Sequence, residues 1–314
     1  MADEKHERVE NLSRRRFLVS VTATAGVVTT ASGLALLGCA ASAAPATGKA
    51  APTAAPTQAP AATQAPAATQ APAAQTTAGK VAWPLPYKKI DPELARKEGH
   101  KAYYAAGCCY GAFAGLLTVL QKEVGGPYLA IPAEMMKYGE GGGVGWGTLC
   151  GALNGSAAMI NMVVGGEEWR ALINELFGWY TQFKFPSDES NKLAEQGKFL
   201  VEKLKYDKAL PQNESGSPLC HVSVTEWCKV AQVNVGDPMR LERCARLTGD
   251  VAAQAAILMN ANAEKTFAAA YKAPAKAEEC RGCHNPKSDF KAGGHVNTKM
   301  DCVPCHEDAH AKKS

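Results

Sequence analysis

The stretch that decides the fold class is residues 237–258, DPMRLERCARLTGDVAAQAAIL. Asp237 followed by Pro238 is typical of a helix start, because the carboxylate can cap a free backbone N–H and proline tolerates the first helical position. Positions on one face of the predicted helix are Leu241, Cys244, Leu247, Val251 and Leu258. This spacing predicts one long amphipathic helix.

Three further segments have helical character. Residues 167–183 place large side chains on one face: Trp169, Leu172, Ile173, Leu176, Phe177 and Tyr180. Residues 108–124 and 149–164 are also predicted helices, and the small residues of the latter favour close helix packing. Because strand signals are sparse over residues 80–272, the predicted fold is all-α, a helical bundle.

The glycine-rich stretch 139–147 invites comparison with a phosphate-binding loop. It lacks the G-x-G-x-x-G register, and no predicted strand precedes it. A tight connection between helices is therefore the preferred interpretation.

The N-terminus indicates export. Residues 13–18, SRRRFL, precede an apolar stretch rich in small residues, which resembles a twin-arginine signal. The stretch ends in Leu36-Leu37-Gly38-Cys39, which resembles a lipobox whose cysteine is lipidated. Simple cleavage near Ala43-Ala44 is the alternative. We therefore expect residues 1–39 to be an export signal and the protein to be extracytoplasmic, anchored to the membrane by lipid.

Residues 40–79 form a low-complexity segment of Ala, Pro, Thr and Gln, with TQAPAA repeated between Thr57 and Ala74. Such a segment has no large apolar side chain to bury and cannot offset its ordering entropy. It is predicted to be a disordered tether between the anchor and a helical domain over residues 80–272. The formal net charge of +4, without a basic cluster, argues against nucleic-acid binding.

The C-terminal residues carry two C-x-x-C-H motifs, Cys280-Arg-Gly-Cys283-His284 and Cys302-Val-Pro-Cys305-His306. In such motifs both thiols form thioethers with haem, and the histidine binds iron as the proximal ligand. The spacing also fits a zinc ribbon, but zinc needs no histidine after each cysteine pair. The motifs predict two haem c groups.

Residues 273–314 have too few large apolar side chains to form a core of their own. They are predicted to be a small, irregular dihaem segment that the cofactors order. Candidates for the distal iron ligands are His295, His310 and His221, whereas His100, flanked by charged residues, is expected at the surface. Two imidazoles favour a lower potential than a histidine–methionine pair.

Six other cysteines lie in the predicted helical domain: Cys108, Cys109, Cys150, Cys220, Cys228 and Cys244. Together with Gly107-Cys108-Cys109-Tyr110-Gly111 and the run 147–155, GTLCGALNG, they resemble the redox family named after its C, GCAxxG, C and C motifs. With the two haem motifs and Ser217-Pro-Leu-Cys220-His221, residues 80–314 resemble split-Soret cytochrome c. The resemblance implies a mainly helical, homodimeric, dihaem protein with bis-histidine iron.

The resemblance also implicates these cysteines in an iron–sulfur centre, and thiolates are the usual ligands of such clusters. Candidate ligands are Cys220, Cys228, Cys244, Cys150 and Cys109, and a [2Fe-2S]-type cluster is the expectation. The Cys108-Cys109 pair leaves open which cysteine is equivalent to the family's first. Buried free thiols or disulfides are the alternative.

The favoured function is electron transfer to or from redox partner proteins. An extracytoplasmic haem or thiol oxidoreductase acting on a small substrate is the second hypothesis, and a zinc-stabilised binding module is the third.

Overall fold

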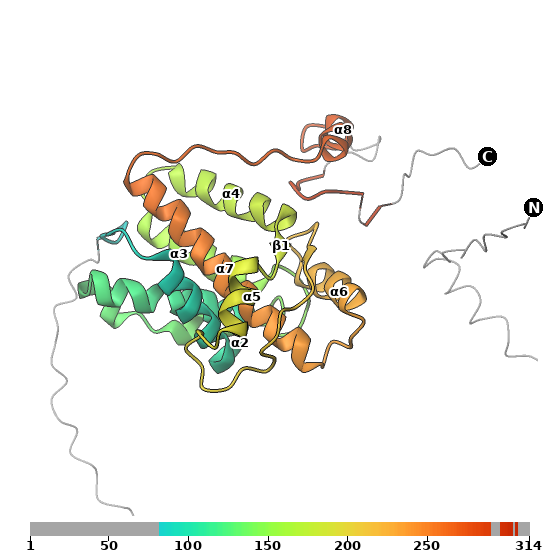
Figure 1. Ribbon diagram of the computed structural model, residues 1–314. Coiled ribbons are helices and arrows are strands. Elements are labelled where there is room, and N and C mark those ends of the chain that lie inside the picture. Colours follow the sequence, from blue (N-terminus) through green and yellow to red (C-terminus); the bar gives the residue numbers. More distant parts are fainter. Residues whose placement is uncertain (1–81, 290–295, 304, 307–314) are drawn as a thin grey trace, which may run out of the picture. The chain divides into compact units, whose positions relative to one another are not determined.

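The computed structural model describes residues 82–289, 296–303 and 305–306 of the chain. Within these residues the elements are helical apart from two two-residue strands, so the predicted all-α class is confirmed (Figure 1). The predicted signal and tether lie outside the described residues. The α-helices are α2 (Pro92–Glu123), α3 (Gly151–Val163), α4 (Glu168–Gln182), α5 (Asp188–Glu195), α6 (Cys220–Ala231), α7 (Pro238–Ala263) and α8 (Ala275–Cys283).

Shorter elements join the helices. Two 3₁₀ helices, η1 (Gly126–Ala130) and η2 (Ala133–Gly139), follow α2. Strands β1 (Lys184–Phe185) and β2 (Asn213–Glu214) pair antiparallel, with Lys184 opposite Glu214. The glycine-rich stretch after η2 is a turn that leads into α3, as predicted, and its glycines adopt positive φ at five positions.

α2 is a helical hairpin rather than one straight helix. Its backbone leaves the helical conformation at Ala106 and at Gly107, whose φ is 77°. The second half then folds back onto the first, so that a Cβ on Gly111 would lie 2.8 Å from Tyr103 Cα. By length and hydropathy α2 alone among the described helices qualifies as a membrane span. The kink and the burial of its apolar face make it a core hairpin instead.

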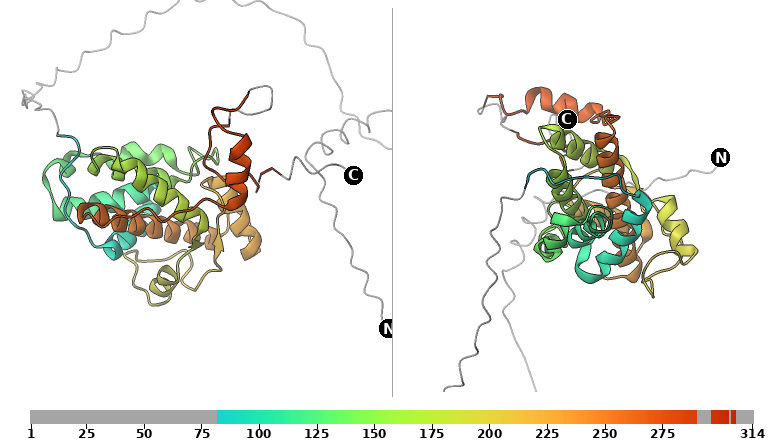
Figure 2. Two further views of the ribbon diagram at one scale, coloured as in Figure 1. Left: turned by 90° about the horizontal axis from the view of Figure 1, so that it is seen from above. Right: turned by 90° about the vertical axis from the view of Figure 1, so that its left-hand side faces the viewer.

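α7 is the helix around which the bundle is built. Asp237 caps it as predicted, accepting a hydrogen bond from Met239 N at 2.8 Å. The helix packs along α2 and also contacts α3 and α4, and these helices lie side by side in Figure 2. Fully buried side chains of the shared core include Phe113, Leu116, Leu153, Ile160, Leu172, Leu176 and Val251.

The predicted helices over 149–164 and 167–183 correspond to α3 and α4, which begin and end within about two residues of the prediction. The helix predicted from Cys108 exists, but α2 begins earlier, at Pro92. The first half of α2 has few large apolar residues and packs against α7 through small residues such as Gly99. Apolar periodicity therefore does not predict this half of the helix.

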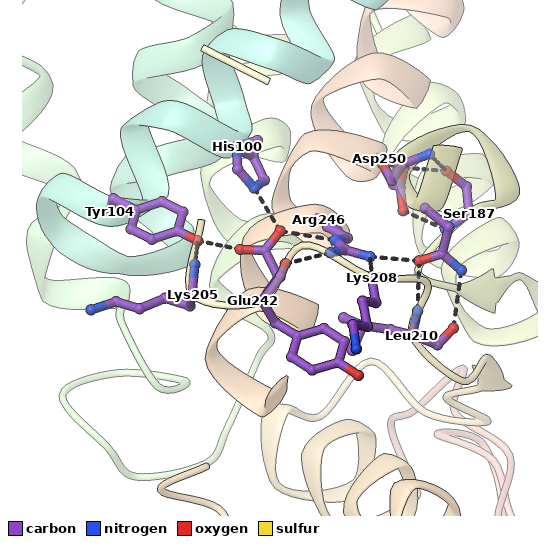
Figure 3. Close-up of polar contacts among 12 residues, drawn as sticks. His100, Tyr104, Ser187, Lys205, Lys208, Leu210, Glu242, Arg246 and Asp250 are labelled. Atoms are coloured by element: carbon purple, nitrogen blue, oxygen red, sulfur yellow. Dashed lines mark hydrogen bonds and ion pairs between the residues drawn. The ribbon is translucent and has the colours of Figure 1, made fainter. Parts of the chain in front are cut away.

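Beside α7 lies a buried polar network (Figure 3). Glu242 accepts hydrogen bonds from Arg246 Nε at 2.8 Å and from the Tyr104 hydroxyl, and it pairs with His100 Nε2 at 3.0 Å. The expectation that His100 is a surface residue is wrong. Its side chain is fully buried and stacks on Phe199, because Glu242 on another helix supplies a partner for Nε2.

Hydrogen bonds dock the start of the C-terminal segment onto α4. Glu175 Oε2 accepts hydrogen bonds from the backbone N–H groups of Ala270 and Tyr271, at 3.0 and 2.9 Å. The ring of Tyr271 occupies the space beside Gly178, where any Cβ would collide with it. Farther along, Lys299 Nζ donates to Asn174 Oδ1 at 2.8 Å. These hydrogen bonds hold this part of the chain against α4.

Candidate redox site

Two cysteines are brought together by a short antiparallel bridge between Leu149 and Leu219. Cys150 N donates to Pro218 O at 2.8 Å, and Cys220 N donates to Thr148 O at 2.7 Å. The bridge holds the chain directly before α3 against the chain directly before α6. Cys150 and Cys220 therefore lie together at the N-terminal ends of two helices.

Cys150 lies at the start of a helix. It is the N-cap residue of α3, so the free backbone N–H groups of Ala152 and Leu153 lie near its side chain. Burial raises the pKa of the Cys150 thiol, whereas these N–H groups and the Tyr180 hydroxyl lower it. N–H donors at a helix N-terminus stabilise a sulfur that carries negative charge.

Cys108 enters the site from α2, just after the kink at Gly107. The glycines that follow Cys150 make room for it: a Cβ on Gly151 would collide with Cys108 Sγ, and one on Gly155 would collide with the Cys109 carbonyl oxygen. The turn after η2 closes the site: burial raises the pKa of Cys108, and the nearby Gly141 N–H lowers it. The glycines of this motif thus permit α3 to approach α2 closely.

Cys244 on α7 completes a group of four thiols from four elements. Burial raises the pKa of Cys108 well above its usual value, and the neighbouring Cys150, Cys244 and Cys220 raise it further. Burial raises the pKa of Cys220 to about 12, with added repulsion from Cys150 and Cys244. Mutual electrostatic effects of this kind require the thiols to lie close together.

The remaining two cysteines lie at the edge of this group. Burial raises the pKa of Cys109 to about 12, and Cys150 is the cysteine that adds to the shift. Its sulfur packs against Gly139 instead of joining Cys220 and Cys244. Cys228 lies about two helical turns after Cys220 on α6. Burial and the nearby Cys244 raise its pKa. Of the vicinal pair, Cys108 thus lies with Cys150, Cys220 and Cys244, although Cys109 was the candidate ligand named from the sequence.

The converging groups suit a thiolate-ligated iron centre in their chemistry. Within the described residues no three cysteine, histidine or carboxylate side chains are spaced to hold a single metal ion. Thiolates are the usual ligands of iron–sulfur clusters, so the donor type of these four cysteines fits such a cluster. No disulfide joins the described cysteines.

The two haem motifs lie next to each other. Cys280 and Cys283 lie at the end of α8, which stops at His284. In the second motif, His306 N donates to Cys302 O at 2.8 Å. Burial and the nearby Cys280 raise the pKa of Cys302, so the first cysteines of the two motifs lie close together. Two groups attached here would be neighbours.

Of the three histidines predicted as distal ligands, the described residues include His221 alone. His295 and His310 lie outside the described residues. His221 is exposed at the start of α6, with its backbone N–H bonded to Gly147 O at 3.0 Å. His100 is enclosed by Glu242 and Phe199 and is remote in sequence from either haem motif.

Sequence reasoning missed the polar residues around Cys150. Tyr180 contributes to the apolar face of α4, but its hydroxyl interacts with Cys150 and donates to Ser223 Oγ at 3.0 Å. Arg243 Nη2 donates to the same Ser223 Oγ at 2.9 Å. The signal available in the sequence was an arginine directly before Cys244. Helical periodicity does not reveal that this arginine bonds to Ser223.

Comparison with known proteins agrees with this architecture. Residues 106–258 match the model of a family described as redox-active protein (C_GCAxxG_C_C). The matched range contains all six cysteines of the helical body. Fold and site thus define a class, that of helical redox proteins with spaced cysteine motifs.

The chain belongs, more narrowly, to the split-Soret cytochrome c family, and it is a redox protein of electron transfer. It is 34% identical to the split-Soret cytochrome c of Desulfovibrio desulfuricans over 230 residues, 72% of this chain and 78% of the relative. A solved structure of that cytochrome, described as containing a novel iron centre, matches with a TM-score of 0.63 and 32% identity. It covers 73% of this chain and 93% of its own.

Proposed function

We propose that the protein is an exported electron carrier that holds two haem c groups and an iron–sulfur centre. The observation that carries this proposal is the convergence of Cys108, Cys150, Cys220 and Cys244 from four separate elements. The relative's iron centre supports the same assignment. A cluster of the [2Fe-2S] type, bound by these four thiolates, supplies a one-electron redox couple in the helical body.

The haem groups are assigned to the two contiguous motifs. Cys280 and Cys283 would hold one haem by thioether bonds, with His284 as the proximal iron ligand. Cys302, Cys305 and His306 would hold the other. The proximity of Cys280 and Cys302 supports attachment sites close enough for fast electron exchange between two haems. The distal ligands would come from His295, His310 and the exposed His221.

Burial favours an electron carrier over a thiol enzyme. Catalytic cysteines need a lowered pKa and access to substrate. Cys108 and Cys109 are instead buried, and burial raises the pKa of both. The vicinal thiols therefore lack the properties of a nucleophile, which weakens the oxidoreductase hypothesis that relies on them.

We also propose that the protein works outside the cytoplasm as a lipid-anchored homodimer. The twin-arginine signal and lipobox support export and anchoring. Exposed apolar side chains gather in residues 126–147 and support a partner surface: Leu129, Met135, Tyr138, Val144 and Trp146. Exposed His221, which follows Cys220, would be available to a haem of the partner subunit. Light scattering of the purified holoprotein tests the dimer.

One set of measurements tests the cofactor assignment. The purified holoprotein should give two covalent haem c groups per chain by pyridine haemochrome, together with non-haem iron and labile sulfide. Electron paramagnetic resonance at several potentials should show bis-histidine haems and a separate cluster signal. Absence of labile sulfide would refute the cluster, and featureless visible absorption would refute the haems.

A further inference from the structure

Arg243 is a buried cation without a carboxylate partner among the described residues. Its side chain is 1% exposed, and its Nε has no hydrogen-bond partner there. Two other arginines at α7 are paired with carboxylates: Arg246 with Glu242 and Arg96 with Asp250. An unpaired buried charge is costly, so Arg243 requires an anion that the described side chains do not supply.

The missing anion would be the iron centre together with its cysteine thiolate ligands. The positive charge of Arg243 lowers the pKa of both Cys220 and Cys228 and thus lies near these sulfurs. Arg243 directly precedes Cys244 in α7. A guanidinium does not lose its proton in proteins, so its charge persists in every redox state.

A chain of hydroxyl groups connects Arg243 with Cys150. Arg243 Nη2 donates to Ser223 Oγ at 2.9 Å, and the Tyr180 hydroxyl lies 3.0 Å from the same oxygen. Burial raises the pKa of the Cys150 thiol, whereas the Tyr180 hydroxyl lowers it, so this hydroxyl lies near the sulfur. Tyr180 and Ser223 are both almost fully buried, so neither hydroxyl can exchange its partner for bulk water.

The protonation state of Cys150 sets the direction of this chain. With Cys150 as a thiol, the Tyr180 hydroxyl can donate to Ser223 Oγ, which lies 3.0 Å away. A thiolate bound to iron can only accept, so the Tyr180 hydroxyl would then donate to Cys150 and Ser223 would donate to Tyr180. Two hydroxyl hydrogens rotate, and Arg243 continues to donate to Ser223. The Cys150 S–H bond breaks when the thiolate binds iron and its proton goes to solvent, whereas Tyr180 and Ser223 keep their protons.

We propose that Arg243, Ser223 and Tyr180 form a buried donor chain that ends on the Cys150 sulfur and raises the reduction potential of the iron centre. This inference rests on the proposed iron–sulfur centre. Reduction adds one negative charge to the centre, and hydrogen-bond donors to the ligating sulfurs stabilise the reduced state more than the oxidised state. The effect is strong because the chain is shielded from solvent. These three side chains are positioning residues, which act through Cys150.

The test compares reduction potentials of the holoprotein and of Tyr180→Phe. The variant should keep its iron and labile sulfide, but its ratio of reduced to oxidised centres at a fixed potential should fall about tenfold, which corresponds to 59 mV for one electron. Potentials of the two haems, measured in the same titration, should stay unchanged. Tyr128→Phe is the matched control, because Tyr128 is equally buried but donates to Pro86 O, away from the cysteines.

Ser223→Ala keeps Tyr180 and every cysteine, and it should shift the potential in the same direction by a smaller amount. If Tyr180→Phe loses the cluster, the Ser223→Ala measurement decides. An unchanged cluster potential in the variant that retains the cluster would overturn the inference. A wild-type protein without a cluster signal would instead overturn the proposed function, so the two failures are distinguishable.

Discussion

The helical body and the haem segment provide redox sites in opposite ways. In the body, four cysteines from α2, α3, α6 and α7 meet inside a core that the chain builds from its own side chains. In the haem segment, each motif is contiguous, and Cys283 and Cys305 are exposed in the described structure. A covalent attachment site needs local geometry only, whereas a site bound by scattered thiols needs the finished fold.

The largest expected effect separates these two kinds of site. Replacing both Cys280 and Cys283 with serine removes the thioether bonds of one motif, so covalent haem should fall to half of the wild-type content. The body should remain folded because its core does not involve the haem segment. Covalent haem by mass spectrometry and helical content by circular dichroism measure this. Loss of helical signal would show that the body depends on haem.

The reciprocal experiment removes a thiol of the body. Cys150→Ala should abolish the iron–sulfur signal and leave both haem groups attached, because it deletes a sulfur at the middle of the group of four. Cys109→Ala is the matched control and should retain the cluster, since Cys109 packs against Gly139. Labile sulfide and the cluster resonance are the readouts. Equal loss in both variants would contradict the assignment of Cys108 over Cys109.

The stability of the body should depend on its buried network. Glu242→Gln leaves Arg246 without its anion, and breaking a buried ion pair costs about 3–5 kcal/mol of unfolding free energy. The control is Glu264→Gln, which breaks the exposed pair with Lys89 and should cost about 0–1 kcal/mol. Denaturant unfolding measures both. Similar losses in the two variants would mean that the network contributes little.

The docking of the haem segment should depend on Glu175. Glu175→Gln weakens the charge-assisted hydrogen bonds from Ala270 and Tyr271, each worth about 1.5–3 kcal/mol. We expect faster proteolysis near residue 270, with the unfolding free energy of the body nearly unchanged. Glu168→Gln, on the first turn of the same helix, is the control. Equal cleavage rates in the Glu175→Gln and Glu168→Gln variants would show that contacts other than those of Glu175 hold the segment on α4.

The smallest expected effect is a loss of unfolding free energy at acidic pH. Burial raises the pKa of Glu242, but hydrogen bonds from His100, Tyr104 and Arg246 outweigh it and leave the pKa below its usual 4.5. The native state then binds fewer protons than the unfolded state, so this stabilisation is complete above pH 4.5 and is lost as pH falls further. Unfolding of the wild type and of Glu242→Gln at several pH values measures this. The variant should show a shallower loss.

Several local features could be predicted because their cause is local. The Asp237-Pro238 start of α7 and the apolar face of α4 depend on a few consecutive residues, and both predictions are confirmed. His100 shows the opposite case. Its charged sequence neighbours indicated solvent, but Glu242, 142 residues away, supplies a buried partner.

By itself, the sequence determined the helical class, the family and the haem motifs, because helix periodicity and C-x-x-C-H chemistry are properties of short contiguous segments. Only the tertiary structure decided which cysteines meet. Cys108 and Cys109 are adjacent in sequence but their sulfurs contact different glycines, Gly151 and Gly139. The kink at Gly107 and the bridge between Leu149 and Leu219 set these positions, and both depend on close packing between distant segments.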